Sequence, residues 1–397
     1  MNNNIRAIQL DLDTLADDNG YYDRDELEDH IVDTVVNSGA NTVYLQSFIE
    51  TVVPDDEEYN KKAGALFFKT PRDVKANIAD KHLLGDAIRL IKQHQPECKV
   101  LAWAPTLNCA WLTEKHRDNE ILTASQEERV WYCRATPFSK ITHDVLTHMY
   151  YALGQVSSRL DGILFQDDLL MSNWEDTSRA GKALLRKLYQ LDTDDEETLF
   201  DFLDDDDNPQ NIEWQQYKTH CLNELSKALF QAFARGYRET FPEKYARRQS
   251  QKSTQLICAR DLYALTIPSA DSKSGEWYAQ NLDLSLDLYD QVVIMAYYNE
   301  EFGYSKGDEK IATPRGRQWI HHLAQGAVDV ANRDGLIRSN KLVMKLQSVI
   351  WIPGQDETYI DKNVLLAQAR ELKKAGIDNI GFYPALEDEA AFNIQTI

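Results

Sequence analysis

The sequence predicts an α/β fold, a (β/α)8 TIM-like barrel that forms a single domain over residues 1–397. Eight apolar, strand-like segments alternate with helix-like segments, and no stretch of linker-like composition divides the chain. Such alternation is typical of parallel α/β folds, and eight units can close into a barrel. A doubly wound open sheet is the alternative. The barrel is favoured because no predicted strand is followed by a GxGxxG or GxxxxGK[ST] nucleotide-binding motif.

The first half of the chain supplies four strands, which are short apolar runs. They are 5–13, 42–48, 99–106 and 161–166. Amphipathic segments between them predict helices at 24–38, 81–95 and 139–160. Gly39 stands directly after the first helix, where a left-handed residue commonly ends a helix. The remaining stretches, 49–80 and 107–137, have no clear period and are interpreted as irregular.

The second half supplies the other four strands. They are 253–260, 291–298, 341–351 and 378–383. Helices are predicted at 212–241, 275–286, 314–332 and 363–375. Only a short tail follows the last strand, so we expect the eighth helix to be abbreviated or missing.

An acidic insertion around residues 193–210 precedes the long helix 212–241. It contains the run Asp204, Asp205, Asp206 and Asp207, which we interpret as part of a solvated loop. Calcium binding is the alternative, but the run lacks the alternating ligand spacing of a calcium loop.

The amino-acid composition limits the kinds of ligand and cofactor that the chain can bind. The chain has 43 Lys and Arg against 64 Asp and Glu, a formal net charge of −21. Such a surface repels phosphate backbones and argues against nucleic acid, whereas a cationic or hydroxyl-rich ligand suits it. The five cysteines and nine histidines show no metal-ligand spacing, so we expect no metal and no cofactor, although one disulfide is compatible with the count. Neither a transmembrane segment nor a signal peptide is visible.

Two adjacent carboxylates, Asp167 and Asp168, follow the strand 161–166. The carboxyl ends of parallel strands form the rim where barrel enzymes carry their chemistry. Neighbouring strand residues point to opposite faces. We therefore expect one carboxylate to face a cleft while the other holds a loop or accepts backbone N–H groups.

The other predicted strands end in aromatic, carboxylate and amide residues. These are Asp11, Asp13, Tyr44, Gln46, Trp103, Asn108, Arg260, Asp261, Tyr297, Tyr298, Gln347, Trp351 and Tyr383. Sugar rings stack on aromatic side chains, and their hydroxyls bond to carboxylates and amides. Glycosidic cleavage needs a carboxyl group to protonate the leaving oxygen and a second group to stabilise the oxocarbenium-like centre. The set therefore predicts a sugar-processing site.

Several of these residues have structural alternatives. Trp103 and Tyr297 follow apolar runs and could belong to the core, and Arg260 could simply pair with Asp261. Asp11 and Asp13 share one face of the first strand, where burial without partners would be costly. At least one of these two acids is therefore expected to act in the site or in a polar network.

An ordered set of motifs resembles the C-terminal glycoside hydrolase domain of the PgaB family of bacterial exopolysaccharide export proteins. The matching segments are 10–13, 43–48, 102–105, 134–138, 161–168, 174–176, 259–260, 276–281, 294–296, 346–347 with Trp351, and 381–384. They are centred on the sequence DGILFQDD and cover almost the whole chain. The family acts on partially de-N-acetylated poly-β-1,6-N-acetylglucosamine, a biofilm polymer.

The resemblance implies a barrel with an electronegative groove, located in the periplasm or cell envelope. Its essential acid corresponds to Asp167, while Asp161 and Asp168 would orient that acid or contact substrate amino groups. The chain departs from the family in having Gln166 where His is often found, and in lacking a glycine-rich acidic turn at 54–58. Nothing resembles the metal-binding histidines of the family's deacetylase domain, so we expect no deacetylase domain and no such activity.

These observations support three hypotheses. The first is endo-hydrolysis of the polymer by Asp167, with Asp168, Asp13 or Asp11 assisting, or with the substrate's own acetamido oxygen as the second group. In the second, the barrel is a non-catalytic module that binds or guides the polysaccharide. In the third, it hydrolyses another amino-sugar glycan.

Overall fold

The computed structural model describes residues 4–15, 22–49, 64–124, 134–250, 255–267, 278–297, 314–350, 358–386 and 393–397. Eight parallel strands close into a barrel in the order β1-β10-β7-β6-β5-β4-β3-β2. They are β1 (Arg6–Leu10), β2 (Thr42–Gln46), β3 (Lys99–Ala104), β4 (Gly162–Phe165), β5 (Ile257–Tyr263), β6 (Gln291–Ala296), β7 (Leu342–Gln347) and β10 (Ile380–Tyr383). β1 pairs with β10 to close the barrel, so the predicted (β/α)8 fold is confirmed and the open sheet is wrong.

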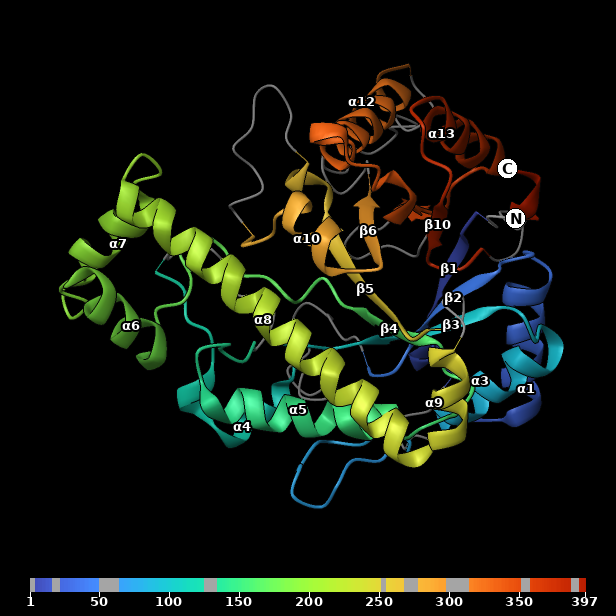
Figure 1. The fold of residues 1–397 in the computed structure, drawn as a ribbon, viewed down its shortest axis with the longest axis horizontal. Coiled ribbons are helices and arrows are strands. Elements are labelled where there is room, and N and C mark those ends of the chain that lie inside the picture. The colour runs from blue at the N-terminus through green and yellow to red at the C-terminus, as the bar shows by residue number, and fades with distance from the viewer. Residues whose placement is uncertain are drawn as a thin grey trace.

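Helices surround the barrel (Figure 1). They are α1 (Arg24–Ile31), which continues as the π-helical segment Val32–Val36, then α3 (Leu83–His94), α4 (Ala110–Lys115), α5 (Lys140–Gly154), α6 (Arg179–Tyr189), α7 (Glu196–Asp204), α8 (Pro209–Thr240), α9 (Pro242–Gln249), α10 (Leu282–Leu288), α12 (Pro314–Ala331) and α13 (Lys362–Lys374). β8 (Val349–Ile350) and β9 (Thr358–Tyr359) form a separate antiparallel pair. In the described residues after β10, the helical structure is the short 3-10 helix Ile394–Thr396.

Two glycines bring α5 into close contact with the C-terminal part of α8 (Figure 1). A Cβ atom on Gly154 of α5 would lie 2.1 Å from the carbonyl oxygen of Phe233. A Cβ atom on Gly236 of α8 would lie 2.0 Å from the carbonyl oxygen of Tyr151. The two helices therefore pack backbone against backbone, which only glycine permits.

The long helix α8 joins two hydrophobic cores. Its C-terminal part, including Leu229, Phe233 and Tyr237, packs on the core of the barrel. Near its N-terminus, Trp214 packs into a smaller core with Leu185 of α6 and residues of α7. At about 1.5 Å per residue, the 32 residues of α8 span about 48 Å, so the helix extends past the barrel strands to reach α6 and α7 (Figure 1).

The solvated loop expected for the aspartate run holds for Asp205–Asp207, which are exposed and non-helical, but Asp204 ends a helix, α7, that occupies residues 196–204 of the insertion and was not predicted. Leu199, Phe202 and Leu203 are buried in the smaller core, at the spacing of one helix face. Only the end of the aspartate run lies in a turn, and Asn208 caps the start of α8 by accepting a hydrogen bond from the Gln210 amide. Apolar spacing, rather than charge, decides the structure of this segment.

Further differences are the helices α6 and α9, where no helix was predicted, and several element boundaries. β5 ends at Tyr263, three residues beyond its predicted end, and α4 occupies part of the stretch expected to be irregular. The described cysteines, Cys98, Cys109, Cys221 and Cys258, are free thiols. Within the described part of the chain, no helix is both long and apolar enough to cross a membrane.

Candidate active site

Asp167 follows β4 at the carboxyl end of the barrel, where its side chain is partly exposed. The hydroxyl of Tyr263, the last residue of β5, donates a hydrogen bond to Asp167 Oδ2 at 3.1 Å. Removal of water around the carboxylate raises the pKa of Asp167, and the charge of Lys345 and the bond from Tyr263 partly oppose this rise. A carboxyl group with a raised pKa suits a general acid.

Asp168 points away from Asp167 and holds the loop that follows β3. Its Oδ2 accepts backbone N–H bonds from Thr106 at 2.8 Å and Asn108 at 2.6 Å, and the Thr106 hydroxyl donates to Oδ1. Burial raises the pKa of Asp168 to about 6 despite these bonds. The structure therefore agrees with the expected division between the two acids. It corrects the catalytic role predicted for Asp168, because both oxygens are occupied by the loop.

A buried cation, Lys345, lies inside the barrel. Its Nζ donates to Asp261 Oδ1 at 2.8 Å and to Gln9 Oε1 at 2.6 Å. These residues come from β7, β5 and β1, which are not neighbours in the sheet, so they meet in the interior. Burial raises the pKa of Asp261 to about 6, and the Lys345 charge opposes the rise. Since a buried charge needs a partner, the ion pair is a structural requirement.

Aromatic rings lie above this ion pair. The ring centroids of Trp103 and Tyr383 are 5.7 Å apart, and those of Tyr383 and Tyr297 are 6.3 Å apart. Lys345 Nζ lies 5.5 Å from the Tyr383 ring centroid and 5.8 Å from that of Tyr297. Trp103 and Tyr297 are nearly fully buried, whereas Tyr383 is partly exposed. The expected aromatic cluster is therefore present at the rim, and Trp103 and Tyr297 also belong to the core.

Amide side chains shape the same end of the barrel. Gln46 Oε1 accepts from the backbone N–H groups of Leu12 and Asp13, and Gln46 Nε2 donates to Asp13 Oδ2 at 3.0 Å. Gln46 thus fixes the turn after β1, which carries the partly exposed Asp11 and Asp13. Gln347 ends β7, and among the described residues its buried amide has no hydrogen-bond partner. Buried amides normally have partners, so we expect water or a ligand there.

Two predicted site residues lie elsewhere. Tyr44 is fully buried in the barrel interior, where its hydroxyl donates to Gln291 Oε1 at 2.9 Å. Arg260 faces outward, because it donates to Asn223 Oδ1 of α8 and to the Leu169 carbonyl. The predicted substrate contacts of Tyr44 and Arg260 are therefore wrong. The alternative pairing of Arg260 with Asp261 is also wrong, since adjacent strand residues point to opposite faces.

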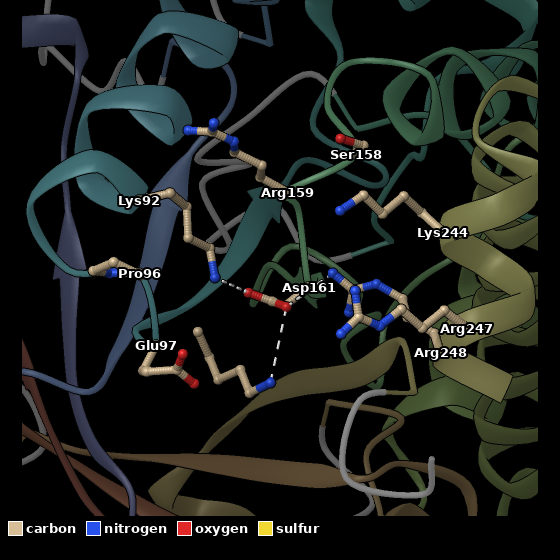
Figure 2. Close-up of a pocket in the computed structure, with 10 residues that line it drawn as sticks. Lys92, Pro96, Glu97, Ser158, Arg159, Asp161, Lys244, Arg247 and Arg248 are labelled. Atoms are coloured by element: carbon tan, nitrogen blue, oxygen red, sulfur yellow. Dashed lines mark hydrogen bonds and ion pairs between the residues drawn. The ribbon is translucent and has the colours of Figure 1, made fainter. Parts of the chain in front are cut away.

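Asp161 lies at the opposite end of the barrel from Asp167, because it precedes β4. Its carboxylate accepts hydrogen bonds from Lys92 at 2.6 Å and from Arg248 at 3.0 Å (Figure 2). It also accepts the backbone N–H of Val100 at the start of β3. Asp161 joins α3, α9 and the barrel, and its predicted role in orienting the acid or contacting substrate is wrong. Asp161 and Asp167 belong to the same sequence motif, but strand β4 lies between them and carries them to opposite ends of the barrel.

The loop after β4 is held by two cations that the sequence analysis did not select. Lys218 of α8 donates to the carbonyl oxygens of Ser172, Asn173 and Glu175. Arg134 forms a buried ion pair with Glu175. Two further residues of the sequence-based site, Trp351 and Tyr298, lie outside the described residues.

Among curated proteins, the chain is 23% identical over 383 residues to the poly-beta-1,6-N-acetyl-D-glucosamine N-deacetylases of Escherichia coli K12 and O157:H7. The match covers 96% of this chain and 49% of the relatives, so the chain spans about half their length. Its fold is similar to the PgaB (BpsB) glycoside hydrolase domain of Bordetella bronchiseptica, with a TM-score of 0.69, 22% identity and coverage of 96% and 94% of the two chains.

A more distant structure is the beta-galactosidase of Marinomonas ef1, with a TM-score of 0.54, 13% identity and coverage of 98% of this chain and 58% of that one. The resemblance seen in the motifs is confirmed by a family match and by the curated relatives. The family described as "Hypothetical glycosyl hydrolase family 13" matches residues 9–383 of the chain. The chain belongs to this glycosyl hydrolase family.

Proposed function

We propose that this protein is an endo-acting glycoside hydrolase that cleaves partially de-N-acetylated poly-β-1,6-N-acetylglucosamine, with Asp167 as the catalytic acid. The observation that carries the proposal is the position of Asp167. It is a partly exposed carboxyl group with a raised pKa at the rim, and its neighbour Asp168 is turned away to hold a loop. The partly exposed ring of Tyr383 offers an aromatic surface of the kind that sugar rings favour, and the buried rings of Trp103 and Tyr297 support it.

In the proposed reaction, Asp167 donates its proton to the glycosidic oxygen as the bond from that oxygen to the anomeric carbon breaks. Positive charge develops at the anomeric carbon and needs a second group. Asp11 or Asp13 can supply a carboxylate from the turn after β1, or the substrate's acetamido oxygen can attack instead. Water then adds to the anomeric carbon and gives a proton to a site carboxylate, which restores the protonated acid and completes hydrolysis.

The substrate assignment is supported by the names of the relatives, which specify poly-β-1,6-N-acetylglucosamine and a PgaB glycoside hydrolase domain. The net charge of −21 is also favourable, because de-N-acetylated units carry ammonium groups that a negative protein attracts. From the resemblance to the PgaB family we propose that the protein acts in the periplasm or cell envelope.

The test is mass spectrometry of the products formed from the partially de-N-acetylated polymer. Wild type is expected to release shorter oligomers. Asp167→Asn should lower the rate by a factor of about 10²–10⁴ or more with unchanged folding, since the amide cannot donate a carboxyl proton. Asp201→Asn removes one carboxylate charge from an exposed position on α7 and should cleave normally.

Three results would contradict parts of this proposal. Normal cleavage by Asp167→Asn would remove Asp167 from the mechanism. Intact polymer that both proteins still bind would favour a non-catalytic binding or export module. Cleavage of another amino-sugar glycan, with neither binding nor cleavage of this polymer, would replace the substrate.

A further inference from the structure

A basic pocket lies at the end of the barrel opposite Asp167. It has a volume of about 410 Å³, within the range of small-ligand sites. Its lining comes from α3, the segment before β4, the start of β3 and α9 (Figure 2). The cationic residues are Lys92, Lys99, Arg159, Lys244, Arg247 and Arg248.

The charge of this pocket contrasts with that of the whole chain. Six cationic side chains line it against two carboxylates, Asp161 and Glu97, which leaves an excess of four positive charges. The chain as a whole carries −21. Like charges gathered in one concave place repel each other, so their concentration needs either carboxylate partners or an external anion.

Carboxylate partners account for only part of this charge. Asp161 pairs with Lys92 and Arg248, and Arg248 is further fixed by the Tyr237 hydroxyl and the Leu160 carbonyl. These buried contacts form a rigid floor. By contrast, Arg159, Lys244 and Arg247 are exposed, and no carboxylate of the described residues forms an ion pair with any of them. Asp161 offsets only one of the three floor cations Lys92, Lys99 and Arg248, so both the floor and the rim keep positive charge.

We propose that this pocket binds a small anion of the phosphate class that carries at least two negative charges. Arginine guanidinium groups present forked donors that match phosphate oxygens, and lysine adds a compact positive charge. Figure 2 shows Lys244 and Arg247 extending from α9, and Arg159 lying across the pocket, so the rim can contact one ligand from two sides. The proposal does not depend on the hydrolase assignment, since the two sites are at opposite ends of the barrel.

The test is isothermal titration of the full chain with inorganic pyrophosphate at low ionic strength. Wild type should bind, and affinity should fall as salt rises. The double variant Lys244→Gln/Arg247→Gln should lose roughly tenfold or more, because it removes two charge-assisted contacts. Both residues are exposed, so the fold should be retained. The control Arg179→Gln/Lys187→Gln removes the same charge from exposed positions on α6 and should bind like wild type.

Sedimentation with phosphatidic acid vesicles, whose phosphomonoester can carry two negative charges, compared with phosphatidylcholine vesicles, separates a lipid headgroup from a free anion as the source of the phosphate. Binding to either source that the α9 variant loses and the α6 control keeps would support the pocket. Equal binding by both double variants would overturn the proposal, because the anion would then bind elsewhere. Absence of binding to both pyrophosphate and the vesicles would also overturn it.

Discussion

At the scale of single residues, burial raises the pKa of Asp167, and Lys345 and Tyr263 oppose this rise. The Tyr263 hydroxyl donates to the carboxylate, and the Lys345 charge acts on it from within the barrel. Both effects favour the ionised acid, while loss of water favours the protonated acid. Asp167 is thus placed between opposing influences, as is common for groups that exchange protons.

Replacement of Tyr263 by Phe should raise the pKa of Asp167 further, because a hydrogen bond to the ionised form is lost. If Asp167 donates the proton, the alkaline limb of the pH profile of kcat/KM should move to higher pH. The measurement is cleavage rate against pH, with Tyr189→Phe on α6 as the control. An unchanged alkaline limb would argue that Tyr263 does not act through Asp167.

Replacement of Lys345 by Met should leave Asp261 as an uncompensated buried carboxylate. Loss of one partner of a buried pair typically lowers the free energy of unfolding by about 3–5 kcal/mol. The pKa of Asp261 is already raised to about 6, and without Lys345 it should rise further. A raised carboxylate pKa contributes stability that is present at acid pH and lost as pH rises through the folded value.

Urea unfolding at pH 5 and pH 8 should therefore show a larger loss for Lys345→Met at pH 8. The double variant Lys345→Met/Asp261→Leu should recover much of the stability, since neither charge is then buried alone. An equal loss at both pH values would show that the effect of Lys345 comes from packing.

The sequence predicts those site residues whose position follows from strand alternation. Asp167, Asp168, Gln46 and Tyr383 lie at the carboxyl end of the barrel as this rule predicts, whereas Tyr44 points into the barrel interior. Tyr263 was missed because β5 runs three residues further than its apolar pattern indicated, and the same error made Arg260 appear to be a rim residue. Lys345 was missed because one lysine in an apolar strand gives no local sign of a partner on β5.

At the scale of elements, the contact between α5 and α8 depends on Gly154 and Gly236. Gly236→Ala should destabilise the protein by about 1–3 kcal/mol or more, because the added methyl group meets the backbone of Tyr151 and the helices must separate. Gly85→Ala on α3 is the matched control. Its Cβ would meet only a methyl carbon of Val156 at 3.8 Å, so it should be neutral or slightly stabilising.

Thermal or urea unfolding of the two alanine variants measures this difference. Similar stabilities would show that the helices can part at little cost.

The close approach itself was not predictable from sequence, since a glycine within a helix does not identify the element that it touches. The helical nature of α7 could have been predicted from the spacing of Leu199, Phe202 and Leu203, but the aspartate run that follows dominated the interpretation.

At the scale of the whole molecule, the two ends of the barrel have different chemistry. The carboxyl end gathers Asp11, Asp13, Asp167 and aromatic rings, while the other end gathers the basic pocket. The alternation of elements was enough to predict the closed barrel. The charge separation was not predictable, because Asp161 and Asp167 stand six residues apart in one motif and only the strand between them assigns them to opposite ends.

The two cores joined by α8 should differ in how often the structure around them opens locally. Backbone amides exchange with solvent at rates set by the local opening of the structure that protects them. The small core buries only a few large side chains, whereas the barrel core is extensive, so the N-terminal turns of α8 should exchange deuterium well before its C-terminal turns. Mass spectrometry of peptides from both halves would detect the step, and uniform protection along α8 would contradict it. If the step is present, the two halves of this one continuous helix open in two separate equilibria.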